Sequence, residues 1–422
     1  MKLEFRSALR RWSRPILLLG SLSSAAYAQT SGEEVPRGRT VATSEQVKSE
    51  IERSRFRLGP IRLLPHFGVS GGYEGNVYGT AGNEVSDWTA TATVGTRWAI
   101  PFGTKVYLRG DVLPEYTWYS ELAERRRFGG LYQASLLGFF NRLSAEAGGS
   151  YARTYDLLSS QDPFRVFEET ERGFANLELQ LSRPFSVFAG GEVQKFRNFQ
   201  EEVPPEVGNV GELDRTSSFA RAGLRYRISR SLDVSARVEY ARTEFDRTRE
   251  RDNQSDAGVL ALFFNRPRLF LNLSGGYRSV EPRGHTNFPE YSTGTGSYFI
   301  SFFVARPLEL QAYGRRGLGY GLNRLDPYYI ETANGGGINL RILQRLTLRG
   351  YGEYIKTTVP VGGAGRRDSI TTFGGGLAVR LFANAVFSGL VSQSDYRSNT
   401  STDRPNIVRY STSLSFGGEL AR

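Results

Sequence analysis

The sequence contains no cysteine, two histidines and one methionine among its 422 residues. The absence of cysteine excludes a disulfide framework and every thiolate metal site. The two histidines, His66 and His285, lie far apart in the chain, and no nucleophile motif accompanies either of them. An enzyme is therefore not expected, and neither is a bound metal or another cofactor.

Long apolar runs are also missing. Beyond the amino-terminal region, no stretch reaches 18 uninterrupted apolar residues, so no transmembrane helix is expected there. The 48 glycines and 13% aromatic residues instead favour strands, turns and the girdles of membrane interfaces. The formal charge is +11. Because the basic residues alternate with apolar ones and form no patch or arm, nucleic acid is not an expected partner.

The first 28 residues have the order of a secretory signal peptide. Basic residues come first, the short apolar stretch "PILLLGSLSSAA" follows, and Ala26 and Ala28 precede the expected cleavage site. Residues 29–60 then form a periplasmic segment that is either flexible or a short helix. In the helical alternative Ser44 is the N-cap, and Val47 and Ile51 share one side. A flexible tether is favoured for this segment, and residues 61–422 form the main domain.

The main domain alternates between apolar and polar residues over strand-length stretches. In "RAGLRYRISRSLDVSARVEYAR", residues 221–242, every second residue is apolar and the positions between them carry most of the charge. This period of two predicts strands with one apolar and one charged face. Similarly, Leu346, Leu348 and Tyr354 would face lipid, whereas Arg349 and Glu353 would face inward.

Tight turns recur about every 40 residues. Most of them carry an arginine, at Arg142, Arg183, Arg230, Arg266, Arg306 and Arg345, and "PFGT" (101–104) and "FANA" (382–385) complete a set of eight. Longer polar segments alternate with these turns. A propeller blade would require four short strands in each period, but two long stretches are present here. A propeller or a β-sandwich is therefore disfavoured.

Short turns on one side and long loops on the other are typical of outer-membrane barrels. Strands of about 9 to 11 residues can cross the hydrocarbon layer, where a sheet must close on itself to satisfy its backbone. We therefore predict an all-β protein, a closed antiparallel transmembrane β-barrel of about 18 strands in the outer membrane. Sixteen strands is the alternative, because residues 254–264 and 385–396 alternate poorly. Turns would be periplasmic and loops extracellular.

Aromatic residues separate by strand end, as expected for two interface girdles. Those close to tight turns are Phe102, Phe140, Phe185, Phe264, Phe303 and Phe382, and those before long loops are Tyr151, Tyr240, Tyr277 and Tyr354. Charged residues at the strand positions that alternate with the lipid-facing ones are expected to line a water-filled lumen. These are Arg109, Asp111, Glu146, Glu178, Glu192, Arg221, Arg225, Arg227, Asp233, Arg237, Glu239, Arg278, Glu309, Arg315, Arg349, Glu353, Arg380 and Arg409. Arg225 or Arg227 could pair with Asp233 on the next strand.

One phrase in the first predicted strand resembles a known family. "GYEGNV", residues 72–77, is similar to the opening of the β-barrel porin 2 family. The general strand pattern extends the resemblance over residues 60–420. The resemblance implies an outer-membrane barrel of Gram-negative bacteria that is associated with exopolysaccharide export. It also implies periplasmic components of polysaccharide export as partners.

Three functional hypotheses follow. The first is a porin-like channel for hydrophilic solutes or for exopolysaccharide, and the second is a non-conducting barrel that serves as a structural or docking component of a secretion complex. In the second hypothesis, loops would block the lumen. The loops after Tyr155 and Phe196 are the candidates for folding into its mouth. The third, an outer-membrane enzyme, has no supporting motif. Expected partners are outer-membrane lipids, lipopolysaccharide and the barrel-insertion machinery.

Overall fold

The structure, a computed structural model, describes residues 43–417 except 55, 80–83, 163, 200–208, 284–287, 289, 324–327, 344, 361–364 and 400–404. The predicted signal peptide lies outside the described residues. Within the described ranges, no helix is long and apolar enough to cross a membrane.

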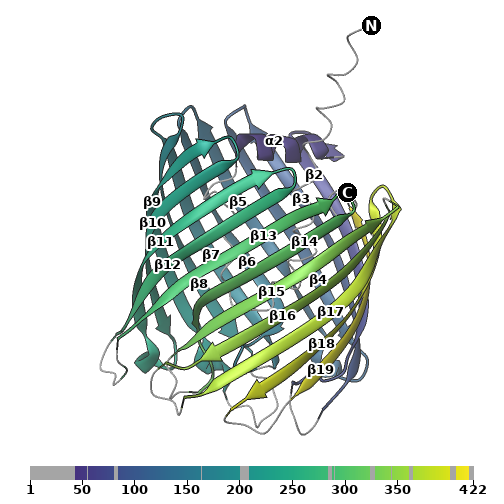
Figure 1. Cartoon of the computed structure of the whole chain (residues 1–422). Helices are drawn as coiled ribbons and strands as arrows, with labels where there is room; N and C mark the ends of the chain where they lie inside the picture. The colour runs from purple at the N-terminus through teal and green to yellow at the C-terminus, as the bar shows by residue number, and fades with distance from the viewer. Residues whose placement is uncertain are drawn as a thin grey trace.

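Long antiparallel strands wrap into a closed cylinder (Figure 1). Each strand from β2 to β19 pairs with the next, and β19 pairs back onto β2 through Arg409 opposite Glu74 and Phe416 opposite Phe67. The prediction of a closed 18-strand barrel is confirmed, including the two segments that alternate poorly, which form β11 and β18. The strands are β2 (Ile61–Glu74), β3 (Asp87–Phe102), β4 (Val106–Tyr119), β5 (Arg127–Phe140), β6 (Leu143–Leu157), β7 (Arg165–Gln180), β8 (Phe185–Asn198), β9 (Arg215–Ser229), β10 (Leu232–Phe245), β11 (Asn253–Arg266), β12 (Leu269–Pro282), β13 (Tyr291–Ala305), β14 (Leu308–Gly319), β15 (Tyr329–Ile342), β16 (Leu346–Thr358), β17 (Arg367–Phe382), β18 (Ala385–Ser398) and β19 (Asn406–Gly417).

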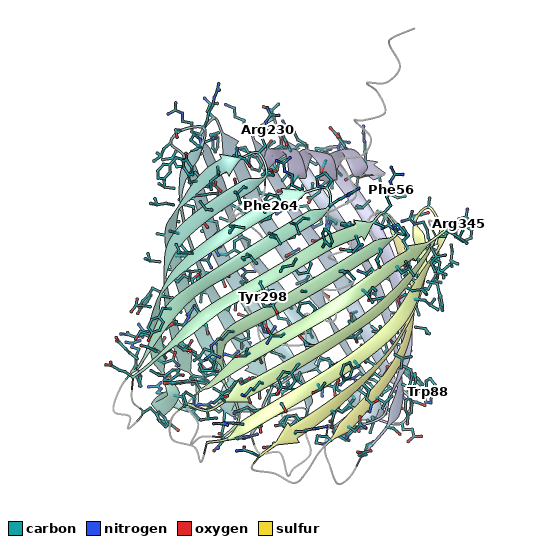
Figure 2. The ribbon with its side chains drawn as sticks, viewed as in Figure 1. Phe56, Trp88, Arg230, Phe264, Tyr298 and Arg345 are labelled. Carbon is teal, nitrogen blue, oxygen red and sulfur yellow. The ribbon has the colours of Figure 1, made fainter. Side chains whose placement is uncertain are left out.

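The two ends of the barrel differ as predicted. Tight turns gather at one end, where Figure 2 shows Arg230 and Arg345, and Trp88 lies at the opposite end. In one of these turns Gly103 adopts a φ of 68°, a left-handed conformation that glycine adopts without strain. In the described parts of the longer connections at the other end there are three short 3₁₀ helices, η2 (Ala123–Arg125), η5 (Val210–Leu213) and η6 (Arg249–Arg251).

The alternation of the sequence becomes the two faces of the wall. Large apolar side chains such as Val94, Leu260 and Phe373 are 57%, 69% and 65% exposed on the outer face. Their sequence neighbours point to the concave side, as successive strand residues must. On β16, Leu348 and Tyr354 face outward, while Arg349 hydrogen-bonds inside the barrel to Asn339. An apolar outer band around a closed sheet is the arrangement of outer-membrane barrels, and this chain is one of them.

Most of the predicted girdle aromatics point outward. Near the tight turns Phe102, Phe140 and Phe382 are exposed, and towards the loops Tyr240, Tyr277 and Tyr354 are exposed. Phe303 is an error of the prediction. The register sets Phe303 opposite Glu309, and together they line a small inner pocket with Asn339. A register shift between Phe303 and Ala305 accompanies this inward placement.

The segment before the barrel contains a helix and a short strand. Helix α2 (Ser44–Arg53) begins at Thr43, whose side chain accepts a hydrogen bond from the Gln46 backbone N–H in a reciprocal capping box. The N-cap is therefore Thr43 and not Ser44, because Thr43 has the glutamine three positions later. Strand β1 (Phe56–Leu58) pairs with the start of β2. Helix α2 lies at the tight-turn end of the barrel (Figure 1).

Candidate functional site: the barrel lumen

The strand register places all eighteen predicted lumen residues on the face opposite the exposed apolar band. Contacts between side chains of strands that are not adjacent show that these residues lie on the inner face. Such side chains can meet only on the concave side of the sheet. Arg109 of β4 contacts Glu146 of β6 at 3.2 Å, and Arg225 of β9 contacts Glu178 of β7 at 2.7 Å. The residues are Arg109, Asp111, Glu146, Glu178, Glu192, Arg221, Arg225, Arg227, Asp233, Arg237, Glu239, Arg278, Glu309, Arg315, Arg349, Glu353, Arg380 and Arg409.

Ion pairs tie neighbouring strands together along this inner wall. Glu239 accepts from Arg237 at 2.6 Å and from Arg278, two strands away, at 2.9 Å. The expected pairing of Arg227 with Asp233 is present at 3.4 Å. Arg225 does not pair with Asp233 but with Glu178, since the register places Arg225 opposite Ser235. The arginine reaches across β8 instead.

Water reaches the inner wall. The side chains of Arg97, Arg109 and Arg172 keep 40%, 27% and 28% of their surface exposed although they point away from the outer face. Eight-stranded barrels are filled by their own side chains, whereas larger ones leave an aqueous interior. The exposed guanidinium groups indicate that this barrel belongs to the second kind.

The described part of the connection between β6 and β7, residues 158–162 and 164, is here named the crossing loop. The ends of β6 and β7 that flank this loop pack against residues of β2, β4 and η2. The Tyr155 ring meets the Tyr119 ring edge-on at 6.3 Å, and Tyr155 also hydrogen-bonds to Arg125. The Nε of Arg165 lies 3.9 Å from the carboxylate of Glu74.

The crossing loop then reaches the opposite wall. In a ring of eighteen strands β15 is the ninth after β6, which makes the two diametrically opposed. The Ser160 backbone N–H donates to the Tyr329 hydroxyl at 3.2 Å, and the Ser160 hydroxyl donates to Glu331. The Gln161 carbonyl accepts from Tyr396 at 2.6 Å and from Arg366 at 3.0 Å. The crossing loop therefore spans the lumen near its extracellular end.

Apolar contacts reinforce this crossing. Leu157 packs against a buried cluster on the far wall made by Ala333, Ile355, Ile370 and Tyr396. These four side chains point inward, where a wet lumen would otherwise expose them. Burying them under Leu157 contributes hydrophobic stabilisation to the crossing.

Other extracellular loops pack against the crossing loop and hydrogen-bond to it. Phe164 and Val166 share a buried cluster with Val210 of η5, with Leu158 and Leu322 at its edge. The Asp162 carboxylate accepts the Leu322 N–H at 2.9 Å. The β14–β15 loop approaches closely through Gly321, where a Cβ would stand 2.3 Å from the Gln161 side-chain oxygen. A larger residue at position 321 would therefore require the Gln161 side chain to move.

Charged side chains at the strand ends hold these loops in place by hydrogen bonds to the backbone. Arg251 of η6 is 1% exposed and donates to the Gly321 carbonyl at 2.8 Å, and burial lowers the pKa of its guanidinium. Asp214 accepts the Asn198 N–H at 2.7 Å, and Asp252 accepts the Phe245 N–H at 2.7 Å. Burial raises the pKa of both carboxyl groups. Each aspartate fixes the point where a strand becomes a loop.

Helix α2 covers part of the inner wall at the periplasmic end. Val47 is fully buried against Tyr107 and Leu137, with Ile51 and Phe139 beside them. Glu50 lies 3.4 Å from Arg109, which also contacts Glu146. The helix therefore leans into the lumen.

A charge at position 47 tests this docking. In Val47→Asp an unpaired carboxylate would face Tyr107 and Leu137, which is strongly unfavourable in an apolar contact. We expect trypsin to cut this variant rapidly after Lys48 in the folded barrel. The exposed substitution Glu45→Gln on the same helix should leave the cleavage rate unchanged. Equal rates for both variants and the unaltered chain would show that α2 is not held by this contact.

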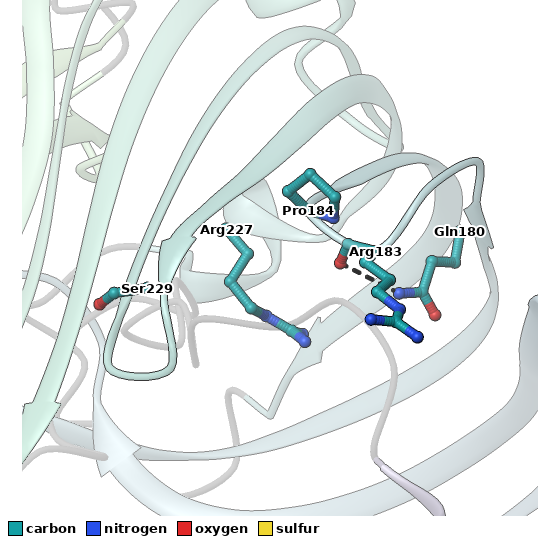
Figure 3. Close-up of a pocket in the computed structure, with 5 residues that line it drawn as sticks. All are labelled: Gln180, Arg183, Pro184, Arg227 and Ser229. Atoms are coloured by element: carbon teal, nitrogen blue, oxygen red, sulfur yellow. Dashed lines mark hydrogen bonds between the residues drawn. The ribbon is translucent and has the colours of Figure 1, made fainter.

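A separate open pocket of about 350 Å³ lies at the rim of the tight-turn end (Figure 3). It is lined by Gln180, Arg183, Pro184, Arg227 and Ser229, and the Gln180 amide donates to the Arg183 carbonyl at 3.2 Å. Its two arginines make this rim basic, but the crossing loop and α2 lie elsewhere. The pocket therefore belongs to the edge of the mouth and not to the narrowed part of the lumen.

Sequence reasoning singled out the loop after Tyr155 as one that could block the lumen, but it did not predict that this loop reaches the opposite wall. The segment "DLLSSQDPFRVFEET" reads as an ordinary polar loop, and its partners Tyr329, Glu331, Arg366 and Tyr396 lie about 170 to 240 residues away. The available signal was weak. The segment contains four large apolar residues, Leu157, Leu158, Phe164 and Val166. A loop exposed to water rarely carries so many, so they indicate that the segment packs against other parts of the protein.

Comparisons with known proteins identify the fold. No protein-family model matches the sequence. No curated protein matches either. Among solved structures, the outer membrane protein OpdK of Pseudomonas aeruginosa is 11% identical with a TM-score of 0.51, covering 84% of this chain and 99% of its own. OccK2 (OpdF) of Pseudomonas aeruginosa is 12% identical with a TM-score of 0.50 and coverages of 84% and 98%. A structure of OccK2 in complex with glucuronate is 14% identical, with the same TM-score and coverages.

These similarities support the outer-membrane barrel fold. They do not confirm the β-barrel porin 2 family, so that resemblance of residues 72–77 stays a prediction.

Proposed function

We propose that this barrel is an outer-membrane channel for hydrophilic solutes. The supporting observation is the charged inner wall, on which Arg97, Arg109 and Arg172 remain solvent-exposed behind an apolar outer band. A lumen for fatty molecules would have an apolar wall instead. The resemblance of "GYEGNV" to exopolysaccharide-associated barrels favours a carbohydrate among the solutes.

The wall charge supports a weak preference for anions. The eighteen predicted lumen residues comprise ten arginines and eight acidic residues, a difference of +2. Most of these charges are paired, so their field on a passing ion is modest. Rings of one sign of charge produce much stronger selectivity in other channels.

Single-channel recording in planar bilayers tests the proposal. We expect steady current steps in potassium chloride and a reversal potential that indicates slight anion preference. In Arg221→Glu/Arg349→Glu the difference becomes −2, because each substitution changes it by two, and the preference should turn to cations. Arg345→Glu, in an exposed turn, is the matched control and should keep the original sign. The absence of any current steps would overturn the channel proposal.

A non-conducting scaffold is the second proposal, and the crossing loop favours it. A loop that leaves one wall and hydrogen-bonds to the opposite wall is what a blocked lumen requires. In this role the barrel would serve a secretion complex, with periplasmic export components as partners. Recording separates the two proposals, because the scaffold passes no steady current.

The outer surface suggests the remaining partners. Lipids and lipopolysaccharide would cover the apolar band, whose side chains such as Val94 and Leu260 are exposed in the isolated chain. The barrel-insertion machinery would receive the closing strands β19 and β2.

A further inference from the structure

A band of aromatic side chains follows the inner wall from β11 to β16. The register places five of them on the concave face. Phe263 lies opposite Asn272, Phe299 opposite both Asn272 and Tyr313, and Tyr351 opposite Gly337 and Gly374. We name the set Phe263, Phe270, Phe299, Tyr313 and Tyr351 the aromatic track. All five side chains are partly exposed. They face the lumen and not the lipid, so their exposed surface is available to a solute.

Two members of the track lie flat on the wall. A Cβ on Gly335 would stand 2.4 Å from Cζ and 2.6 Å from the hydroxyl oxygen of Tyr313. A Cβ on Gly374 would stand 2.4 Å from Cζ and 2.5 Å from the hydroxyl oxygen of Tyr351. The phenol ends therefore occupy the space that a side chain would take above each glycine. One ring face rests on the backbone, and the other faces the lumen.

The three phenylalanines are arranged differently. The Phe263 and Phe270 rings meet edge to face at 5.3 Å, and the Phe270 and Phe299 rings do so at 5.8 Å. Edge-to-face contact of this kind is a favourable packing of rings on each other. The phenylalanine cluster thus supports itself and continues the apolar surface towards the tight-turn end. Tyr313 and Tyr351 are the members with a flat face available.

Polar groups of both signs stand beside the two tyrosines. The Arg315 Nε donates to Glu331 at 2.8 Å, and the Arg349 Nε donates to Asn339 at 3.1 Å. The Gln311 amide donates to Glu309 at 2.9 Å. Cationic, anionic and amide groups therefore alternate along the track. A ligand that fits this surface needs apolar faces for the rings and many neutral hydrogen-bonding groups at its edges.

We propose that the aromatic track binds a neutral, linear oligosaccharide of pyranose units as it moves through the lumen. A pyranose ring presents C–H groups on its faces and hydroxyl groups around its edge, which matches flat tyrosines flanked by charged groups. Tyr313 and Tyr351 are two strands apart, about 10 Å at the usual strand spacing. Two sugar units that are not adjacent in the oligosaccharide could thus contact the two rings at the same time. This inference rests on the proposed channel and specifies its substrate class.

Other ligand classes fit less well. An anionic solute would require an excess of arginine next to the rings, but Glu309, Glu331 and Glu353 accompany Arg315 and Arg349 there. An apolar solute would displace water from these charged groups and offer no hydrogen bonds in its place, which is costly.

Binding of maltohexaose to the detergent-solubilised full chain, measured by isothermal titration calorimetry, tests the proposal. We expect Tyr313→Leu/Tyr351→Leu to weaken binding by about tenfold or more, because both flat contact surfaces are lost. Tyr354→Leu removes an outward tyrosine of the same strand, β16, and should bind as the unaltered chain does. Poly(ethylene glycol) of similar mass should show no binding to any of these proteins.

Gly335→Ala/Gly374→Ala keeps both tyrosines and tests their positions. The added methyl groups would push the rings off the wall, so maltohexaose binding should fall although no aromatic group is lost. Heat-dependent electrophoretic mobility verifies that each variant is a folded barrel. In bilayers, maltohexaose should interrupt the current of the unaltered chain and do so far more briefly in the tyrosine double variant.

The outcomes separate this inference from the channel proposal. Undetectable maltohexaose binding by the unaltered chain, or equal binding by the tyrosine double variant, would overturn the saccharide site. Binding that depends on Tyr313 and Tyr351 in a barrel without current would support the site while refuting conduction.

Discussion

A chain in which residues 156–166 are replaced by Asn-Gly should conduct several-fold more current than the unaltered chain. Tyr155 and Phe167 are paired across the β6–β7 hairpin, so a two-residue turn can join them. The change removes the crossing loop and with it the contacts to Tyr329, Arg366 and Tyr396 on the far wall. Single-channel conductance in planar bilayers provides the measurement.

A second variant separates chain length from structure. Replacing residues 156–166 with Gly and Ser residues of equal number retains the length of the loop but removes the side chains of Leu157 and Gln161 and the fixed position of residue 160. We expect larger and noisier currents from this variant, because flexible segments of Gly and Ser have no fixed position. Unchanged conductance in the shortened chain would show that the crossing loop does not limit the current. Electrophoretic mobility before and after heating again verifies folding.

Val94→Arg should lower the free energy of unfolding by about 2 to 4 kcal/mol if Val94 lies near the bilayer midplane. Val94 is midway along β3, points outward and is 57% exposed in the isolated chain. In the membrane its arginine replacement would have only hydrocarbon around it. Denaturant titration of the barrel in lipid vesicles measures the change.

The adjacent position supplies the control. Thr93 points inward and lies opposite Glu115, so Thr93→Arg places the same charge in the wet lumen beside a carboxylate. Its effect on the free energy of unfolding should remain within about 1 kcal/mol, as for other solvated ion pairs. Equal losses from the two variants would contradict the assignment of lipid and lumen faces.

The lumen is narrowed at both ends by elements that are not part of the barrel wall. The crossing loop spans the extracellular end, and α2 covers Tyr107 and Leu137 at the periplasmic end. Both elements bury inward-facing apolar residues that would otherwise contact water. Tyr313 and Tyr351 of the aromatic track lie near the middle of β14 and β16, between these two ends. A solute would therefore pass α2 and the crossing loop, with the tyrosines positioned to hold it in between.

The sequence by itself determined the two-faced strands, their number and the side of the wall on which each charge lies. These properties follow from a period of two and from turn residues, both of which are local, so Arg349 and Glu353 could be assigned to the lumen from their neighbours alone. Only the tertiary structure decided that Arg225 pairs with Glu178, that Phe303 turns inward and that the crossing loop spans the lumen. Each of these depends on curvature, on a register shift or on contacts between segments far apart in the chain. Alternation along a single strand cannot encode such distances, because it specifies a face but not what lies across the barrel from it.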